Sequence, residues 1–313
     1  MTRSIPDIDI PSLTGKTAVV TGGSDGIGLR IATRLARAGA EIVLPVRNAE
    51  KGATAAAGIR DAVPHARVRT TPLDLSSLDS IAAFGETMNA DAQPVHLLIN
   101  NAGVMTPPTR QTTADGFELQ FGTNHLGHVA LVAHLLPVLR AGSARVTSQV
   151  SVAASSGRIH WSDLQWEQSY DGMRAYRQSK IAFGLFGLEL DRQSEAHGWG
   201  ITSNLSHPGV APTSLLAARP ELGRTTDTLE VRVIRWASAR GLIVGTPESA
   251  ALPALAAATL STSSARALYS PGGPGRMGGM PSEQPLYAPL KSTEDASRIW
   301  RISEELVGVT FPR

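Results

Sequence analysis

The stretch Thr17-Ala-Val-Val-Thr-Gly-Gly-Ser-Asp-Gly-Ile-Gly28 decides the fold. It opens with a short apolar run, typical of a buried strand, passes through closely spaced glycines, and leads at once into a helical pattern. Glycines at this spacing permit a tight turn and a close approach of backbone to ligand, while the amides and dipole of a helix start favour a pyrophosphate. The residues predicted to form this phosphate-binding loop are Gly22, Ser24, Asp25, Gly26, Ile27 and Gly28.

Beyond this stretch, short apolar runs alternate with longer helical patterns over the first two hundred residues. Such alternation is typical of a parallel sheet covered on both faces, in which ligands bind beyond the carboxyl ends of the strands. The predicted fold is therefore a Rossmann-type α/β domain, with a doubly wound parallel sheet and helices on both faces. Strands are predicted at 17–20, 41–46, 68–73, 95–99, 144–147 and 201–205, and helices at 27–38, 49–62, 78–90, 117–139 and 175–197.

The rest of the 313-residue chain is predicted to belong to the same single domain, with a C-terminal extension at 262–313. The segment 209–245 mixes prolines and glycines with leucines and a tryptophan. It predicts an apolar substrate lid, and an ordinary pair of linking helices is the alternative. Between Ser270 and Met280, five glycines and two prolines predict a loop.

Composition excludes several classes of protein. The chain has no cysteine, which rules out disulfides, thiolate metal sites and a cysteine nucleophile. No apolar run approaches a membrane span and no signal-peptide pattern opens the chain, so a cytoplasmic location is expected. The net charge is +2 and the arginines are scattered, which argues against a nucleic-acid partner.

The end of the second predicted strand, Leu44-Pro45-Val46-Arg47-Asn48, indicates which dinucleotide binds. An NAD-binding protein usually places a carboxylate here, against the ribose hydroxyls. A neutral residue followed by Arg47 removes that repulsion and supplies a guanidinium able to bind a 2′-phosphate through paired donors. NADP(H) is therefore predicted over NAD(H); a solvated surface arginine is the alternative reading.

The next two strand ends also suit a dinucleotide. Asp74 and Leu75 follow the third strand, where the carboxylate is expected to accept a hydrogen bond from an adenine amine. Asn101, Ala102 and Gly103 follow the fourth, where small residues let a cofactor pass close to the backbone. Either feature alone is a plausible turn, but together with the first two strand ends they indicate one cofactor-binding edge.

Tyr176 and Lys180 lie four residues apart at the start of a predicted helix, so that both side chains share a face. A tyrosine with a pKa of about 10 is a poor base at neutral pH, and lowering it by three units takes about 4 kcal/mol. A lysine cation about 4 Å away supplies energy of that order. The pair is predicted to act as general acid/base. A packed tyrosine beside a solvated lysine is the alternative, although lysine is rare in this chain.

These motifs together resemble the short-chain dehydrogenase/reductase family over nearly the whole chain. Thr21–Gly28 resembles its glycine motif, Asn101–Gly103 its Asn-Ala-Gly motif, and Tyr176 with Lys180 its Tyr-x3-Lys pair. The resemblance implies hydride transfer between the cofactor and a carbonyl or alcohol. It implies Tyr176 as the proton donor or acceptor and Lys180 as pKa modifier and ribose ligand. The remaining implied roles are Ser151 orienting the substrate oxygen, Asn124 holding its helix and a relay water, and Pro208, Gly209 and Thr213 meeting the cofactor.

Some features point to one branch of that family. The separation of Ser151 and Tyr176 by 24 residues is about twice the common one, and the segment 123–128 and the glycine-rich tail also resemble the retinol-dehydrogenase and protochlorophyllide-reductase branch. The lack of cysteine argues against a photoreductase. The implied substrate is a hydrophobic aldehyde, ketone or alcohol, and a homodimer or homotetramer is expected. The physiological substrate, the direction of reaction and the oligomeric state stay open.

Other readings of the sequence carry less support. His125, His128 and His134 have helical spacing, but no carboxylate accompanies them, so no metal site is predicted. A catalytically silent NADP(H)-binding sensor with the same fold is the main functional alternative, and a membrane-bound lipid enzyme is a weaker one. All four candidate catalytic residues are retained, which favours an enzyme.

Overall fold

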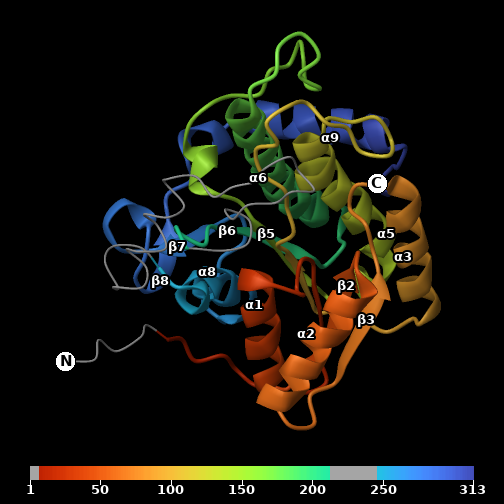
Figure 1. Ribbon diagram of the computed structural model, residues 1–313, viewed down its shortest axis with the longest axis vertical. Helices are drawn as coiled ribbons and strands as arrows, with labels where there is room; N and C mark the ends of the chain where they lie inside the picture. Colours follow the sequence, from red (N-terminus) through yellow and green to blue (C-terminus); the bar gives the residue numbers. More distant parts are fainter. Residues whose placement is uncertain (1–6, 212–244) are drawn as a thin grey trace.

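The computed structural model describes residues 7–211 and 245–313. Its centre is an eight-stranded sheet in the order β3-β2-β1-β4-β5-β6-β7-β8, parallel except for the antiparallel pair β7 and β8 (Figure 1). The strands are β1 Thr17–Val20, β2 Glu41–Val46, β3 Val68–Pro72, β4 Leu97–Asn100, β5 Arg145–Gln149, β6 Thr202–Ser206, β7 Leu268–Pro271 and β8 Pro281–Gln284. The helices are α1 Gly26–Arg37, α2 Ala49–Ala62, α3 Leu78–Ala90, α4 Leu119–Phe121, α5 Gly127–Ala141, α6 Gly172–His197, α8 Pro247–Thr259 and α9 Thr293–Val307; the short turns are η1 Gly122–Leu126, η2 Val152–Ser155, η4 Pro274–Arg276 and η5 Ala288–Leu290.

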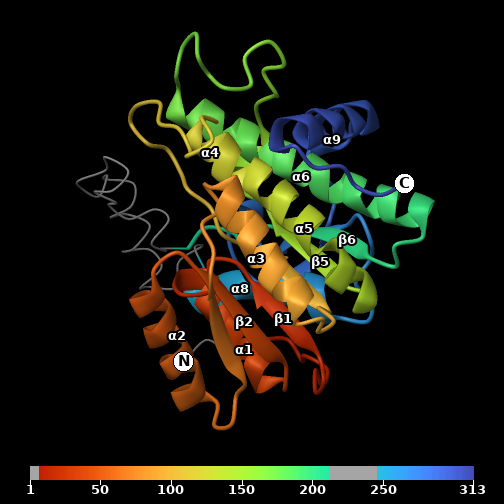
Figure 2. The ribbon, with the colours of Figure 1, turned by 90° about the vertical axis from the view of Figure 1, so that its right-hand side faces the viewer.

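Two apolar cores lie on the two faces of the sheet, because successive strand residues point to opposite faces. Ala18 and Val20 of β1 enter the core beneath α1, α2 and α8, whereas Val19 enters the core beneath α3, α5 and α6. Figure 2 shows α3, α5 and α6 side by side, with α9 packed outside α6. The predicted doubly wound α/β fold is confirmed.

Most predicted elements are present, and 17–20, 41–46, 49–62 and 78–90 match to the residue. The helix predicted at 117–139 is observed as one continuous helical run from 119 to 141, made of α4, the π-helical turn η1 and α5; the sequence did not predict the π-helical turn. Gly127 packs so closely that a Cβ there would lie 2.3 Å from the Leu75 carbonyl oxygen. The turn places Asn124 inside η1 rather than in a regular helix.

The C-terminal part completes the sheet. β7 pairs in parallel with β6, and β8 then pairs antiparallel with β7. The loop predicted at 270–280 is therefore wrong at its start, since Ser270 and Pro271 lie in β7, and η4 adds a short turn within it. The predicted lid at 209–245 lies, except for its two ends, outside the described residues.

The sequence of α8 shows no helical alternation of apolar and polar residues, because this alanine-rich helix is buried on all sides. Its start is nevertheless well specified: Pro247 occupies the first turn, and Thr246 and Ser249 form a capping box. In the part of the chain that the structure describes, no helix has both the length and the apolar character needed to cross a bilayer.

Candidate active site

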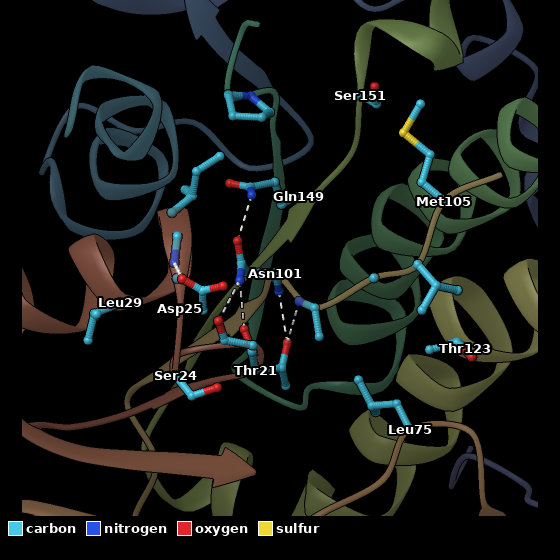
Figure 3. A pocket seen from close by; sticks show the side chains of 18 of the residues that line it. Thr21, Ser24, Asp25, Leu29, Leu75, Asn101, Met105, Thr123, Gln149 and Ser151 are labelled. Carbon is cyan, nitrogen blue, oxygen red and sulfur yellow. Dashed lines mark hydrogen bonds between the residues drawn. The ribbon is translucent and has the colours of Figure 1, made fainter. Parts of the chain in front are cut away.

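A cleft of about 1710 Å³ opens at the carboxyl ends of the strands (Figure 3). It collects loops that follow β1, β2, β3, β4, β5 and β6, as the topology of an open parallel sheet requires. Nearly all the predicted site residues line it: Gly22, Ser24, Asp25, Gly26, Ile27, Gly28, Arg47, Asp74, Leu75, Asn101, Ala102, Gly103, Ser151, Tyr176, Lys180, Pro208 and Gly209. Thr213 lies outside the described residues.

The glycine loop, residues 22–28, exposes backbone without side chains to the cleft at Gly22, Gly26 and Gly28. Gly22 has a φ of +64°, which favours glycine, and a Cβ at Gly28 would lie 2.2 Å from the Gly22 carbonyl oxygen. Asp25 caps α1 by accepting a 2.6 Å hydrogen bond from the Gly26 amide. A loop so closely approached by a helix start suits a pyrophosphate, so the residues present fit a dinucleotide.

One hydrogen-bond network ties three strand ends together (Figure 3). Asn101 Nδ2 donates to the Thr21 carbonyl oxygen at 2.8 Å, and the amides of Asn101 and Ala102 donate to Thr21 Oγ1 at 2.9 and 3.0 Å. Gln149 Nε2 donates to Asn101 Oδ1 at 2.7 Å. The ends of β1, β4 and β5 therefore keep a fixed spacing beneath the cleft.

His128 extends this network below the cleft. Its Nδ1 lies 3.1 Å from the Asn124 carbonyl oxygen and its Nε2 3.3 Å from Thr21 Oγ1. Burial lowers the pKa of His128 to about 3, so the ring is neutral. A neutral ring that donates from Nδ1 accepts at Nε2, where it shares the single Thr21 hydroxyl hydrogen with the Ile99 carbonyl oxygen, also 3.3 Å from Oγ1. His125 bonds separately, with Nε2 2.7 Å from Ser303 Oγ.

The buried histidines predict a specific acid sensitivity. Burial lowers the pKa of His125 and His128 to about 3 and that of His207 to about 4, whereas an unfolded histidine titrates near 6.5. Below pH 6.5 these three histidines therefore bind protons in the unfolded chain but not in the folded chain. We expect the free energy of unfolding to fall by up to about 4 kcal/mol per pH unit between pH 6 and 4.

Urea unfolding at a series of pH values measures this dependence. His128→Gln should reduce the slope by about one third, because it removes one of the three buried histidines. A free energy of unfolding that stays constant from pH 7 to 5 would contradict this assignment.

At the end of β2 the Arg47 side chain is exposed and lines the cleft. Lys51 and Thr54 of α2 line the same part, as does Glu50. Asp74 also reaches the cleft, but its Oδ1 already accepts hydrogen bonds from the Ser76 amide and hydroxyl at 2.9 and 2.6 Å. Only its second oxygen remains for a ligand.

Tyr176 and Lys180 lie on one face of α6 and are 3% and 4% exposed. Lys180 Nζ donates to the Gln149 carbonyl oxygen at 3.0 Å, which directs the ammonium into the cleft beside the end of β5. A hydrogen bond also joins the side chains of Ser151 and Tyr176. In Figure 3, Ser151 and Met105 lie on one side of the cleft, and Ser24 and Asp25 on the other.

The expected lowering of the tyrosine pKa is wrong for the protein's own groups. Burial raises the pKa of Tyr176 to about 12, and the hydrogen bond with Ser151 offsets only part of this. Burial likewise lowers the pKa of Lys180 to about 8. The cost of removing both groups from water exceeds the electrostatic gain that the four-residue spacing suggested.

Asn124, expected to hold its helix and a relay water, does not line the cleft. It is fully buried, and its side chain accepts from the Val104 amide at 2.7 Å and donates to the Val104 carbonyl oxygen at 2.9 Å. Nδ2 also donates to Ser179 Oγ at 3.0 Å. Asn124 therefore fixes the loop after β4 against α6.

Sequence reasoning missed several residues of the cleft. Gln149 is the most informative, because it binds Asn101 through its side chain and Lys180 through its carbonyl. No sequence pattern indicates the contact between Lys180 and the Gln149 carbonyl, because any residue type has a backbone carbonyl. Lys51 had a signal: lysine occurs only four times in the chain, and two of the four line the cleft.

Comparisons with known proteins agree with this geometry. The sequence profile described as short chain dehydrogenase matches residues 16–222. Human retinol dehydrogenase 13 is 40% identical over 304 residues, covering 96% of this chain and 87% of that protein. A crystal structure from Mycobacterium paratuberculosis matches with a TM-score of 0.78 and 32% identity, covering 97% of this chain and 98% of that one. The Pseudomonas aeruginosa RhlG/NADP complex matches with a TM-score of 0.62 and 25% identity, covering 82% and 93%.

The matched profile covers well over half of the chain, and the identity to the human protein extends over almost all of it. The resemblance inferred from the glycine loop and the Tyr176–Lys180 pair is confirmed. The protein therefore belongs to the short-chain dehydrogenase family, as an oxidoreductase similar to the retinol dehydrogenases that interconverts an alcohol and a carbonyl group.

Proposed function

We propose that this protein is an NADP(H)-dependent oxidoreductase that reduces a hydrophobic aldehyde or ketone, or oxidises the corresponding alcohol. The observation that carries the proposal is that Tyr176, Lys180 and Ser151 line the same cleft as the glycine loop. In Figure 3, Ser151 lies on one side of this cleft and Ser24 and Asp25 on the other. A dinucleotide bound along the cleft would extend from the glycine loop toward Ser151 and Tyr176. All three side chains then face its reactive end.

The cofactor-holding residues follow from the cleft. Gly22, Ile27 and Gly28 would receive the pyrophosphate, Asp74 and Leu75 the adenine, and Arg47 the 2′-phosphate. Ala102 and Gly103 would lie under the middle of the cofactor, where a Cβ at Gly103 would come within 3.0 Å of Asn124 Oδ1. Pro208, Gly209 and Thr213 would complete the nicotinamide end, and Lys180 would bind the ribose.

With NADP(H) held by these residues, the chemistry it would supply is a hydride given to, or taken from, the substrate's carbonyl carbon. In the reducing direction Tyr176 donates its proton to the substrate oxygen, which becomes the alcohol hydroxyl; in the oxidising direction the proton returns to Tyr176. Burial raises the pKa of Tyr176 to about 12, so the phenol is protonated at neutral pH, which favours proton donation in the reducing direction over proton acceptance in the oxidising one. Ser151 donates a second hydrogen bond to that oxygen. Lys180 holds a positive charge beside Tyr176, and Asn124 acts as a positioning residue through Val104.

The walls around the reactive end support a hydrophobic substrate. Val152 and Met173 line the cleft, where they are 39% and 38% exposed. Met105 and Val150 line it as well. Retinol, named in the human relative, is an apolar alcohol. A large exposed apolar surface inside a cleft suits such a ligand.

Cofactor preference depends on Arg47 in this proposal. Arg47→Glu removes the guanidinium and adds a charge that repels a 2′-phosphate, so NADPH affinity should fall by about 10- to 100-fold while NADH affinity changes little. Fluorescence titration of both nucleotides measures the two constants. Arg140→Glu makes the same charge change at an exposed position outside the cleft and should affect neither. Tighter binding of NADH than NADPH by the wild type would contradict the assignment.

The function itself is tested by following nucleotide oxidation with a panel of aliphatic aldehydes, retinal and apolar ketones. Turnover of apolar aldehydes with NADPH supports the proposal. NADPH binding without turnover of any member would favour the silent sensor instead.

A further inference from the structure

The segment between β5 and α6 builds a second cavity beside the cleft. This segment includes η2 and rises as a green loop at the top of Figure 1. The cavity has a volume of about 380 Å³ and is lined by Gly157, Arg158, His160, Arg174 and Arg177. Three guanidinium groups and an imidazole therefore surround one small space.

Within residues 7–211 and 245–313, no carboxylate forms an ion pair with Arg158, Arg174 or Arg177. Two acidic residues are close by, but Asp163 accepts from the Glu167 and Gln168 amides and Asp171 caps α6. Among the described residues, three arginines therefore stand against two nearby carboxylates, which leaves an excess of positive charge.

The local structure holds these groups in place. Arg174 Nη2 lies 3.2 Å from His160 Nε2, and its guanidinium lies 5.2 Å from the centre of the Trp166 ring. The His160 amide donates to Gln178 Oε1 at 2.9 Å, which anchors the loop on α6. Burial and the charges of Arg174 and Arg158 lower the pKa of His160, so a neutral ring accepts from Arg174 and orients it.

The cavity adjoins the proposed reactive end of the cleft. Arg177 lines both spaces and follows Tyr176 directly in the sequence. Ser155 and Ser156 of the same segment line the cleft just before Gly157 enters the cavity. An elongated substrate that binds with one end at Tyr176 can therefore extend into this basic cavity.

We propose that the cavity binds an anionic group, a carboxylate or phosphate, carried by the substrate at a distance from its reacting carbonyl. Arginine forks bind both anions through paired, charge-assisted hydrogen bonds. The space admits such a group but is too small for a second cofactor. The substrate class is then an apolar chain with a carbonyl at one position and an anion at another; this rests on the proposed oxidoreductase function.

A matched pair of substrates tests the proposal: an ω-oxo fatty acid and the n-alkanal of the same chain length. We expect kcat/KM to be about 10- to 100-fold higher for the ω-oxo acid, mainly through a lower KM. The double variant Arg158→Gln/Arg174→Gln, which leaves the residues of the main cleft intact, should lose this preference and still reduce the alkanal. Arg37→Gln/Arg140→Gln removes the same charge elsewhere and should keep the preference.

A binding measurement separates this proposal from the proposed function. Titration with a saturated fatty acid should change tryptophan fluorescence saturably, because Trp166 contacts both His160 and Arg174, and the double variant should lose the response. If neither aldehyde is reduced, the proposed function fails, and this titration still decides the anion site. Equal kcat/KM for the two aldehydes, or wild-type binding to phosphatidylglycerol vesicles in place of the fatty acid, would overturn it.

Discussion

Tyr176→Phe is expected to lower kcat for carbonyl reduction by about 10²- to 10⁴-fold, with NADPH affinity nearly unchanged. The ring packs at a position that is only 3% exposed, so phenylalanine keeps the shape of the site and removes only the proton donor. Steady-state rates at saturating aldehyde, with nucleotide binding measured on the same samples, give both quantities.

The matched control is Tyr287→Phe. Tyr287 is also buried, but it does not line the cleft. It should keep wild-type turnover, which would show that loss of a buried hydroxyl is not in itself damaging. Turnover of Tyr176→Phe within threefold of wild type would remove Tyr176 from the mechanism and leave the rest of the cleft without a proton donor.

Lys180→Met should have the second large effect. It deletes the ammonium that donates to the Gln149 carbonyl, and we expect kcat/KM for NADPH at pH 7 to fall by about 10- to 100-fold. The pH profile is the sharper readout, because burial lowers the pKa of Lys180 to about 8. Above pH 8 the wild type loses the cation, so kcat/KM should fall about tenfold per pH unit.

In Lys180→Met this alkaline decline should be absent, since no group is left to titrate there. Tyr176 does not supply it, because its pKa is raised to about 12. Lys291→Met removes a lysine outside the cleft and should keep the wild-type profile. An alkaline decline that persists unchanged in Lys180→Met would assign it to another group.

The fold was predictable from sequence wherever local pattern and tertiary structure agree. The strands at 17–20 and 41–46 are mostly apolar runs that each pair with a strand on both sides, and the glycine spacing at 22–28 defines the turn between β1 and α1. The edge of the sheet was harder. β7 is four residues long and its hydrogen bonds to β6 come from a segment more than sixty residues away, so no local pattern marks it.

The sequence predicted which residue types make up the candidate site, but not the pKa values of those residues. The spacing of Tyr176 and Lys180 gave their common face correctly, yet the pKa of each depends on burial by elements distant in sequence. The same holds for Asn124, whose buried side chain binds the Val104 backbone within a π-helical turn. The sequence also does not show that Arg158, Arg174 and Arg177 line one basic cavity, because the fold of the loop before α6 brings them together.

Hydride transfer to a carbonyl is the central claim, and isotope transfer tests it most directly. The protein is incubated with an apolar aldehyde and NADPH deuterated at both positions of nicotinamide C4, and the product alcohol is analysed by mass spectrometry. We predict one deuterium on the carbinol carbon of each product molecule, and formation of this product about 10²- to 10⁴-fold more slowly with Tyr176→Phe. An alcohol product without deuterium, or no alcohol from any aldehyde while NADPH binds, would contradict the proposal.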